Sequence, residues 1–329
     1  MTYLKEYNSK MLYSLLFIAA VSVICTFLGY LFPIIGGAVF GITVGMILSN
    51  TTGIMKHLPK KGVDFTAKKV LQYSIILMGF GFSIQTVIKT GLDSLSVTLV
   101  TIFTAFFSMF IFSKLLKTSP KLSNLIGVGT AICGGSAIAA VSPVIRADDQ
   151  EISYAVSTIF LFNVLAVFIF PFFGHLMNMD QLSFGLWAGT AINDTSSVVA
   201  AAYSYGDVAG DHATVVKLTR ATLIVPIALI YAGIEIYRSR QGSAKVSLVK
   251  IFPWFILFFV LAAVFSSIVG LPAEVSQWLK NLSKFMITMA LCAIGLKTDF
   301  RKILSSGYKP LLLGFLVWLS VSLTALMLI

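Results

Sequence analysis

The chain has 329 residues, of which 57% are hydrophobic and only 11% are charged. A soluble domain cannot keep that much apolar surface from water, so the composition excludes an ordinary soluble protein and predicts a polytopic membrane protein. The net charge of +11 comes from Lys and Arg at the ends of apolar segments, where they signal topology and contact lipid phosphates, so we expect no nucleic-acid partner.

Runs of roughly 20 apolar residues predict an all-α membrane protein with eleven segments in one integral domain, residues 1–329. The predicted segments are 11–32, 34–49, 69–88, 92–116, 122–145, 152–176, 182–203, 213–237, 248–269, 276–296 and 311–329. If each segment crosses once, 18 of the 24 Lys and Arg residues fall on the side of the N terminus. This bias predicts a cytoplasmic N terminus and a C terminus outside.

One predicted segment carries a polar cluster, at Gly189–Ala202. A carboxylate inside a membrane segment is costly, so it is expected only where it faces a bundle interior or a water-filled cavity. Asp194 is therefore a candidate functional residue, and the residues around it are candidate ligand-binding residues: Asn193, Thr195, Ser196 and Ser197.

The polar cluster has an echo sixty residues earlier, because Gly129–Ile132 repeats the sequence of Gly189–Ile192. The earlier copy continues with Cys133, Gly134, Gly135 and Ser136, and it contains Thr130. Both copies interrupt an apolar segment with residues that unwind a helix, which is typical of transporter binding sites. Close helix packing through small residues is the competing interpretation of the earlier copy.

The echo leaves two topologies open. Segments 122–145 and 182–203 either cross the membrane once each, or they are re-entrant hairpins that reduce the number of crossings to nine. The second topology gives the echo the meaning of an inverted repeat, and both agree with the charge bias.

Two basic residues, Lys217 and Arg220, lie inside the segment at 213–237 and share one helix face. Lys217 could reach the headgroups by snorkelling, whereas we expect Arg220 to pair with Asp194 or to face a cavity. Together with helix N-termini at the two breaks, these cations favour a small anion as the ligand. Asp194, with Asn193 beside it, would then couple transport to H⁺ or Na⁺.

The sequence gives no sign of an enzyme or a metal centre. Cys25, Cys133 and Cys292 lie in three different apolar segments, so we expect neither a disulfide framework nor a metal site. No catalytic triad motif or phosphate-binding loop is present, and we expect no cofactor beyond a coupling ion.

Three stretches carry a family resemblance: GTAICGGSAIAA at Gly129, GTAINDTSSVVAAA at Gly189 and VVKLTR at Val215. They resemble the YeiH-like sulfate exporter family of bacterial inner-membrane proteins, and the resemblance extends over most of the chain. It implies a multi-pass secondary transporter of the inner membrane with an inverted-repeat fold. The pair Asn193–Asp194 is also similar to the Asn-Asp dyad of some cation/proton antiporters.

We therefore expect a secondary transporter, such as an exporter, of a small anion such as sulfate or a sulfonate. The alternatives are a cation/proton antiporter that uses Asp194, and an intramembrane enzyme or a non-transporting binding protein. The expected partners are the small anion and the lipid bilayer, and a homodimer is left open.

Overall fold

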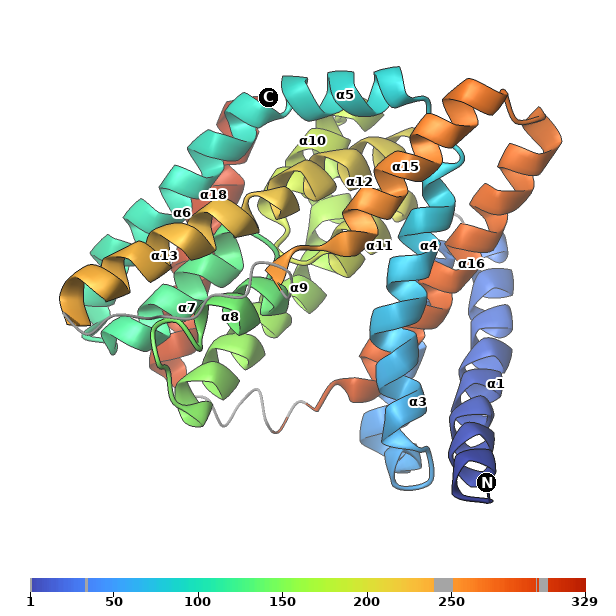
Figure 1. Ribbon diagram of the computed structural model, residues 1–329, viewed down its shortest axis with the longest axis horizontal. Coiled ribbons are helices and arrows are strands. Elements are labelled where there is room, and N and C mark those ends of the chain that lie inside the picture. Colours follow the sequence, from blue (N-terminus) through green and yellow to red (C-terminus); the bar gives the residue numbers. More distant parts are fainter. Residues whose placement is uncertain (1, 33–34, 240–250, 300, 302–306) are drawn as a thin grey trace. The chain divides into compact units, whose positions relative to one another are not determined.

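The computed structural model describes residues 2–32, 35–239, 251–299, 301 and 307–329, and every regular element in these ranges is a helix (Figure 1). The chain forms two compact units. Unit 1 consists of Met1–Lys89, Val199–Gly210 and Trp254–Phe300, and unit 2 of Thr90–Val198, Asp211–Pro253 and Arg301–Ile329. Helices α5, α11 and α12 contribute residues to both units.

Unit 1 combines the N-terminal helices with helices from Trp254–Phe300. Its long helices are α1 (Thr2–Leu31) and α16 (Ala273–Lys297), and α1, α4 and α16 run side by side (Figure 1). Its other helices are α2 (Gly36–Ile47), α3 (Lys60–Phe65), α4 (Leu71–Gly79), most of α5 (Ile84–Asp93) and α15 (Trp254–Val269). Short helical turns at Leu48–Thr52, Ile54–Lys56 and Thr66–Val70 join them.

Unit 2 contains both segments of the sequence echo, each divided into two helices. Its helices are α6 (Leu95–Leu116), α7 (Pro120–Ala131), α8 (Gly135–Val141), α9 (Asp149–Leu176), α10 (Gln181–Ala191), the start of α11 (Thr195–Tyr205), most of α12 (Asp207–Thr222), α13 (Ile224–Ser239) and α18 (Tyr308–Met327). Helix α18 packs along α6, and α7 packs against both α6 and α9.

Fewer helices span a membrane than the eleven that the sequence predicts. Within the described residues, six helices are long and apolar enough to cross, or seven if Lys60–Gly79 and Ile84–Asp93, bent by 111°, form one span. The difference arises because α2 has only 12 residues and α15 only 16, and because the two echo segments are broken into short helices. The predicted segments 34–49 and 248–269 begin at residues outside the described part of the chain.

Polar caps fix where several helices of unit 2 begin. The Ser119 side chain accepts a hydrogen bond from Leu122 N at the start of α7, where Pro120 occupies the first turn. Asp148 and Glu151 form a reciprocal capping box at the start of α9, and Asp180 accepts from two backbone N–H groups of α10. Hydrogen bonding to the Ser183 side chain, together with these backbone N–H groups, holds the pKa of the Asp180 carboxyl below its ordinary value.

Small residues allow α2 and α16 of unit 1 to approach closely. A Cβ atom added to Gly45 would meet the carbonyl oxygen of Cys292, and one added to Gly295 would meet that of Ile42. The obstacles are backbone atoms, which cannot rotate away. The packing of these two helices therefore requires glycine at both positions.

We expect Gly45→Ala and Gly295→Ala each to destabilise the protein by about 1–3 kcal/mol, because overpacking forces the backbones apart. The measurement is thermal unfolding of the purified protein in detergent. Gly233→Ala in α13 is the matched control, since no atom lies within 4 Å of the added Cβ there. Equal midpoints for Gly45→Ala and Gly233→Ala would contradict the tight packing.

Candidate functional site

The first echo segment is a hairpin of two helices. The Lys121 Nζ at the start of α7 donates a hydrogen bond of 2.7 Å to the backbone oxygen of Arg146, which follows α8. Between these ends, Gly129 of α7 lies against the side chain of Ile138 of α8. The two ends of this segment therefore lie close together, and whether residues 122–145 cross the membrane once or are re-entrant stays open.

The two breaks fall at equivalent positions of the echo. Helix α7 ends at Ala131 and α10 at Ala191, and each is followed by an Ile whose N–H still bonds to the helix, Ile132 to Val128 O and Ile192 to Ala188 O. The next helices begin after Gly134 and Asp194. The prediction of two interrupted segments is therefore confirmed.

Side chains and backbone bring the two breaks together inside unit 2. The backbone N–H of Asp194 donates to Asn163 Oδ1 of α9 at 3.1 Å. A Cβ atom on Gly134 would lie 3.6 Å from both Asn163 Nδ2 and the Cβ of Asp194. We call this place the junction, and it comprises 132–134, 192–194, Asn163, Lys217 and Arg220.

Gly134 has a backbone φ of +64°, in the left-handed region where a side chain is strained. The first break therefore depends on glycine. The second break contains no such glycine and is stabilised by side chains instead, as described below.

Lys217 and Arg220 of α12 are fully buried and bind the carbonyl ends of both broken helices. Lys217 Nζ donates to the backbone oxygens of Ile132 and Ile192, both at 2.9 Å. Arg220 Nε donates to Ala131 O at 2.7 Å, and its Nη1 and Nη2 donate to the backbone oxygens of Thr190 and Thr130. The pairs 132 with 192 and 130 with 190 are equivalent in the echo, so each cation bridges matching carbonyls.

This arrangement differs from the pairing expected for Arg220. Its three nitrogens bind carbonyl oxygens, and it makes no ion pair with Asp194 in the described part of the chain. The C-terminal end of a helix carries roughly half a negative charge, and two such ends meet here in a buried place. In this conformation the two cations neutralise those ends.

Asp194 acts as the N-cap of α11. Its carboxylate accepts hydrogen bonds from the backbone N–H of Ser196 at 3.0 Å and from the Ser196 hydroxyl. The residue is half-buried, and the Lys217 ammonium lies within electrostatic range. Asp194 is therefore the acidic side chain of the junction, and it remains partly accessible.

Asn193 is fully buried, and neither its Oδ1 nor its Nδ2 has a hydrogen-bond partner among the described residues. An unpaired buried amide costs about 1–3 kcal/mol. Among the described residues, Asn193 is a buried side chain with two polar atoms that this conformation leaves without a partner.

The remaining predicted binding residues differ in burial. Cys133, Thr195 and Ser197 are buried near the breaks, whereas Gly135 and Ser136 are exposed at the start of α8. The Thr130 hydroxyl donates to Ile126 O of its own helix. The backbone carbonyls that bind Lys217 and Arg220 were missed by the sequence interpretation, although the echo marks their equivalence. All three cysteines are free, and no group of side chains in the described residues could hold a metal ion.

Replacing Arg220 with Met removes the donors from three buried carbonyl oxygens, and we expect a loss of about 3–5 kcal/mol of stability. Arg220→Lys keeps the charge but loses the planar fork, so we expect an intermediate loss. Both are measured by thermal unfolding in detergent.

Lys89→Gln, at an exposed position, is the control and should change stability by less than about 0.5 kcal/mol. An Arg220→Met protein as stable as this control would show that the carbonyl contacts contribute nothing.

Comparison with known proteins identifies the family. The family model described as "Conserved hypothetical protein 698" matches residues 10–314. A UPF0324 membrane protein of Clostridium tetani is 44% identical over 98% of this chain and 96% of its own length. UPF0324 membrane protein FN0533 of Fusobacterium nucleatum is 45% identical over 91% of this chain and 92% of its own length. No solved structure matches the chain.

The names of these relatives agree with the apolar helices and indicate a multi-pass membrane protein. They name no substrate, so the sulfate export implied by the YeiH-like resemblance stays a prediction. The chain belongs to the family described as Conserved hypothetical protein 698, and its relatives are named UPF0324 membrane proteins.

Proposed function

We propose that this membrane protein is a secondary transporter of a small anion, such as sulfate or a sulfonate, and that the junction is its substrate site. The observation that carries the proposal is the meeting of two broken helices at a buried place that also holds an unpaired amide, Asn193. Broken helices in matching parts of one chain are the usual framework of a transporter site.

The electrostatics of the junction favour an anion. The negative ends of α7 and α10 bind Lys217 and Arg220, so they do not repel a ligand. Helix α11 presents its positive N-terminal end there. The two positive charges exceed the roughly half negative charge on each of the two helix ends by about one unit, and an ionised Asp194 cancels that excess. Neutralising Asp194 therefore leaves the positive charge that attracts an anion.

Asp194 is proposed as the coupling residue. It is the carboxylate of the junction, it is half-buried, and protonation or Na⁺ binding would remove its repulsion of an anion. The same observation favours a second candidate function, a cation/proton antiporter in which Asp194 binds the exchanged ions. The inner-membrane location, the cytoplasmic N terminus and the external C terminus belong to the proposal as well.

Replacing Asn193 with Leu should separate function from stability. The apolar side chain has a similar shape and removes the unpaired amide, so we expect the unfolding free energy to rise by about 1–2 kcal/mol. Uptake of radiolabelled sulfate or methanesulfonate into proteoliposomes should fall at least about tenfold, the loss expected when one ligand hydrogen bond is removed. A more stable protein with full uptake would show that Asn193 is not a ligand residue.

Asp194→Asn should abolish the dependence of anion uptake on pH or Na⁺, because an amide carries no charge and neither gains nor loses a proton as the pH changes. The assay compares uptake with and without imposed proton and sodium gradients. Asp149→Asn, an exposed position at the start of α9, is the matched control.

Uptake by Asp194→Asn that keeps its full gradient dependence would exclude the coupling role. If instead no anion is transported, but Na⁺ or Li⁺ addition changes the internal pH of vesicles carrying the unaltered protein, the antiporter is the correct function.

A further inference from the structure

A second polar constellation belongs entirely to unit 1, whereas the junction belongs to unit 2. A cavity of about 300 Å³ opens there between the N-terminal part of α2, the end of α11, the start of α12 and the middle of α16. Its lining includes Ala38, Tyr203, Asp207, Asn281, Lys284 and Phe285. Pockets from this size upward bind small organic ligands.

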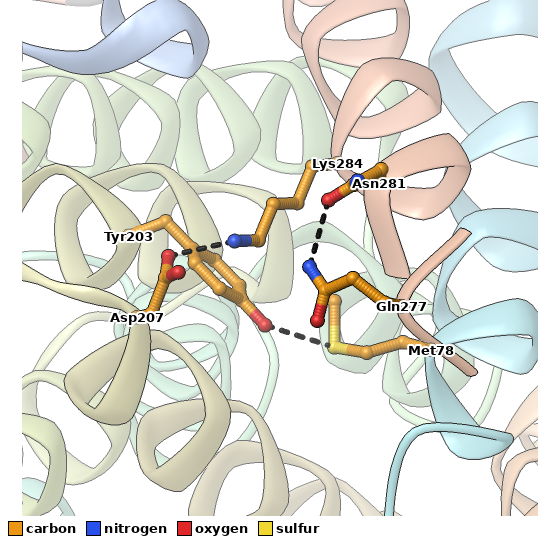
Figure 2. Close-up of polar contacts among 6 residues, drawn as sticks. All are labelled: Met78, Tyr203, Asp207, Gln277, Asn281 and Lys284. Carbon is orange, nitrogen blue, oxygen red and sulfur yellow. Dashed lines mark hydrogen bonds and ion pairs between the residues drawn. The ribbon is translucent and has the colours of Figure 1, made fainter. Parts of the chain in front are cut away.

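An ion pair stands at this cavity. Figure 2 shows the Lys284 ammonium directed toward Asp207, and the distance from Nζ to Oδ1 is 2.7 Å. The Lys284 side chain is 32% exposed and that of Asp207 is 72% exposed. Because exposed ion pairs contribute little net free energy, another anion that reaches the more enclosed Lys284 can replace the Asp207 carboxylate.

Further hydrogen-bond donors lie beside Lys284. Asn281 is one helical turn away on α16, where its Oδ1 accepts from Gln277 (Figure 2). Its Nδ2 has no hydrogen-bond partner among the described residues. Helix α2 begins at Gly36 without a side-chain cap, because Ile35 occupies the N-cap, and its first residues line the cavity. The Gly36 N–H donates to Phe32 O, and the partial positive charge of this helix start favours an anion.

The remaining wall is apolar. Phe285, Ile287 and Ala38 line the cavity, and the Tyr203 ring lies 5.3 Å from the Lys284 ammonium. The Tyr203 hydroxyl donates to the sulfur of Met78, which fixes the ring in place (Figure 2). A bare inorganic anion leaves this wall unused, whereas an organic anion covers it.

We propose that this cavity binds a small organic anion, a carboxylate or a sulfonate, whose head group displaces Asp207 from Lys284 and whose body packs against Phe285 and Tyr203. The site is separate from the junction and goes beyond the proposed function, because its occupancy is a matter of binding and does not require transport.

Benzenesulfonate is the test ligand, with benzenesulfonamide as its uncharged analogue and inorganic sulfate as the anion without an apolar body. Binding to the full chain in detergent is measured by calorimetric titration of the unaltered protein and of Asn193→Leu. The ligands are compared in Asn193→Leu, so that an anion bound at the junction does not enter the comparison. We expect benzenesulfonate to bind at least about tenfold more tightly than either comparison compound, as expected when one charged contact or one apolar face is lost.

Variants of the ion pair give the sharper test because their effects should have opposite signs. Lys284→Met removes the cation and should weaken benzenesulfonate binding at least about tenfold. Asp207→Asn removes the competing carboxylate and should tighten binding about two- to fivefold. If the ion pair were only structural, both variants would act in the same direction.

The ion pair of Lys297 with Asp64, 2.6 Å long and also in unit 1, is the matched control. Lys297→Met and Asp64→Asn should leave benzenesulfonate binding unchanged. Absence of binding, equal binding of the sulfonamide or sulfate, equal signs for the Lys284 and Asp207 variants, or equal effects of the control pair would each overturn the proposal.

Asn193→Leu separates this site from the junction. We expect it to leave benzenesulfonate binding unchanged even where it abolishes transport. If Asn193→Leu abolishes binding and Lys284→Met does not, the anion binds at the junction. That result overturns the unit 1 site and leaves the proposed transport function standing.

Discussion

The neutralisation of backbone carbonyls by two buried cations is the interaction on which unit 2 depends. A broken helix inside a membrane protein exposes carbonyl oxygens where no water can satisfy them, and each unsatisfied group is costly. Two breaks at one place roughly double the number of carbonyl oxygens that need a donor. Lys217 and Arg220 supply donors and positive charge to five carbonyl oxygens from the two segments.

The two copies of the echo solve the same backbone problem with different residues, and the difference creates the chemistry. The first copy turns at Gly134 through a left-handed φ, which requires no side chain. The second copy uses Asp194 to cap α11 through Ser196, and Asn163 binds the Asp194 N–H. A carboxylate and two amides are thereby placed at the second break. The breaks alone would make a structural feature, and these polar groups make a candidate site.

The positions of the breaks could be predicted from the sequence, because Gly134 and the Asn193–Asp194 pair are local helix-breaking signals. The number of spans could not. A hydropathy window averages over the residues on both sides of a break. The hairpin of α7 and α8 therefore gives the same signal as one long apolar segment. The partners of Arg220 were also beyond sequence reasoning, because a search for charge partners considers carboxylates and overlooks backbone oxygens. In unit 1, Lys284 and Asp207 resemble ordinary surface charges until the fold brings them to one cavity.

Asn193 is the residue at which stability and function diverge. A buried amide is normally hydrogen-bonded in a folded protein, yet both polar atoms of Asn193 lack partners. Asn163, which also belongs to the junction, accepts a hydrogen bond from the Asp194 N–H. A conformation that leaves an amide unpaired lies higher in free energy than one that pairs it. Any ligand or helix movement that supplies a donor and an acceptor at 193 therefore gains that energy. The unpaired amide is thus hydrogen-bonding free energy that this conformation of the junction does not gain.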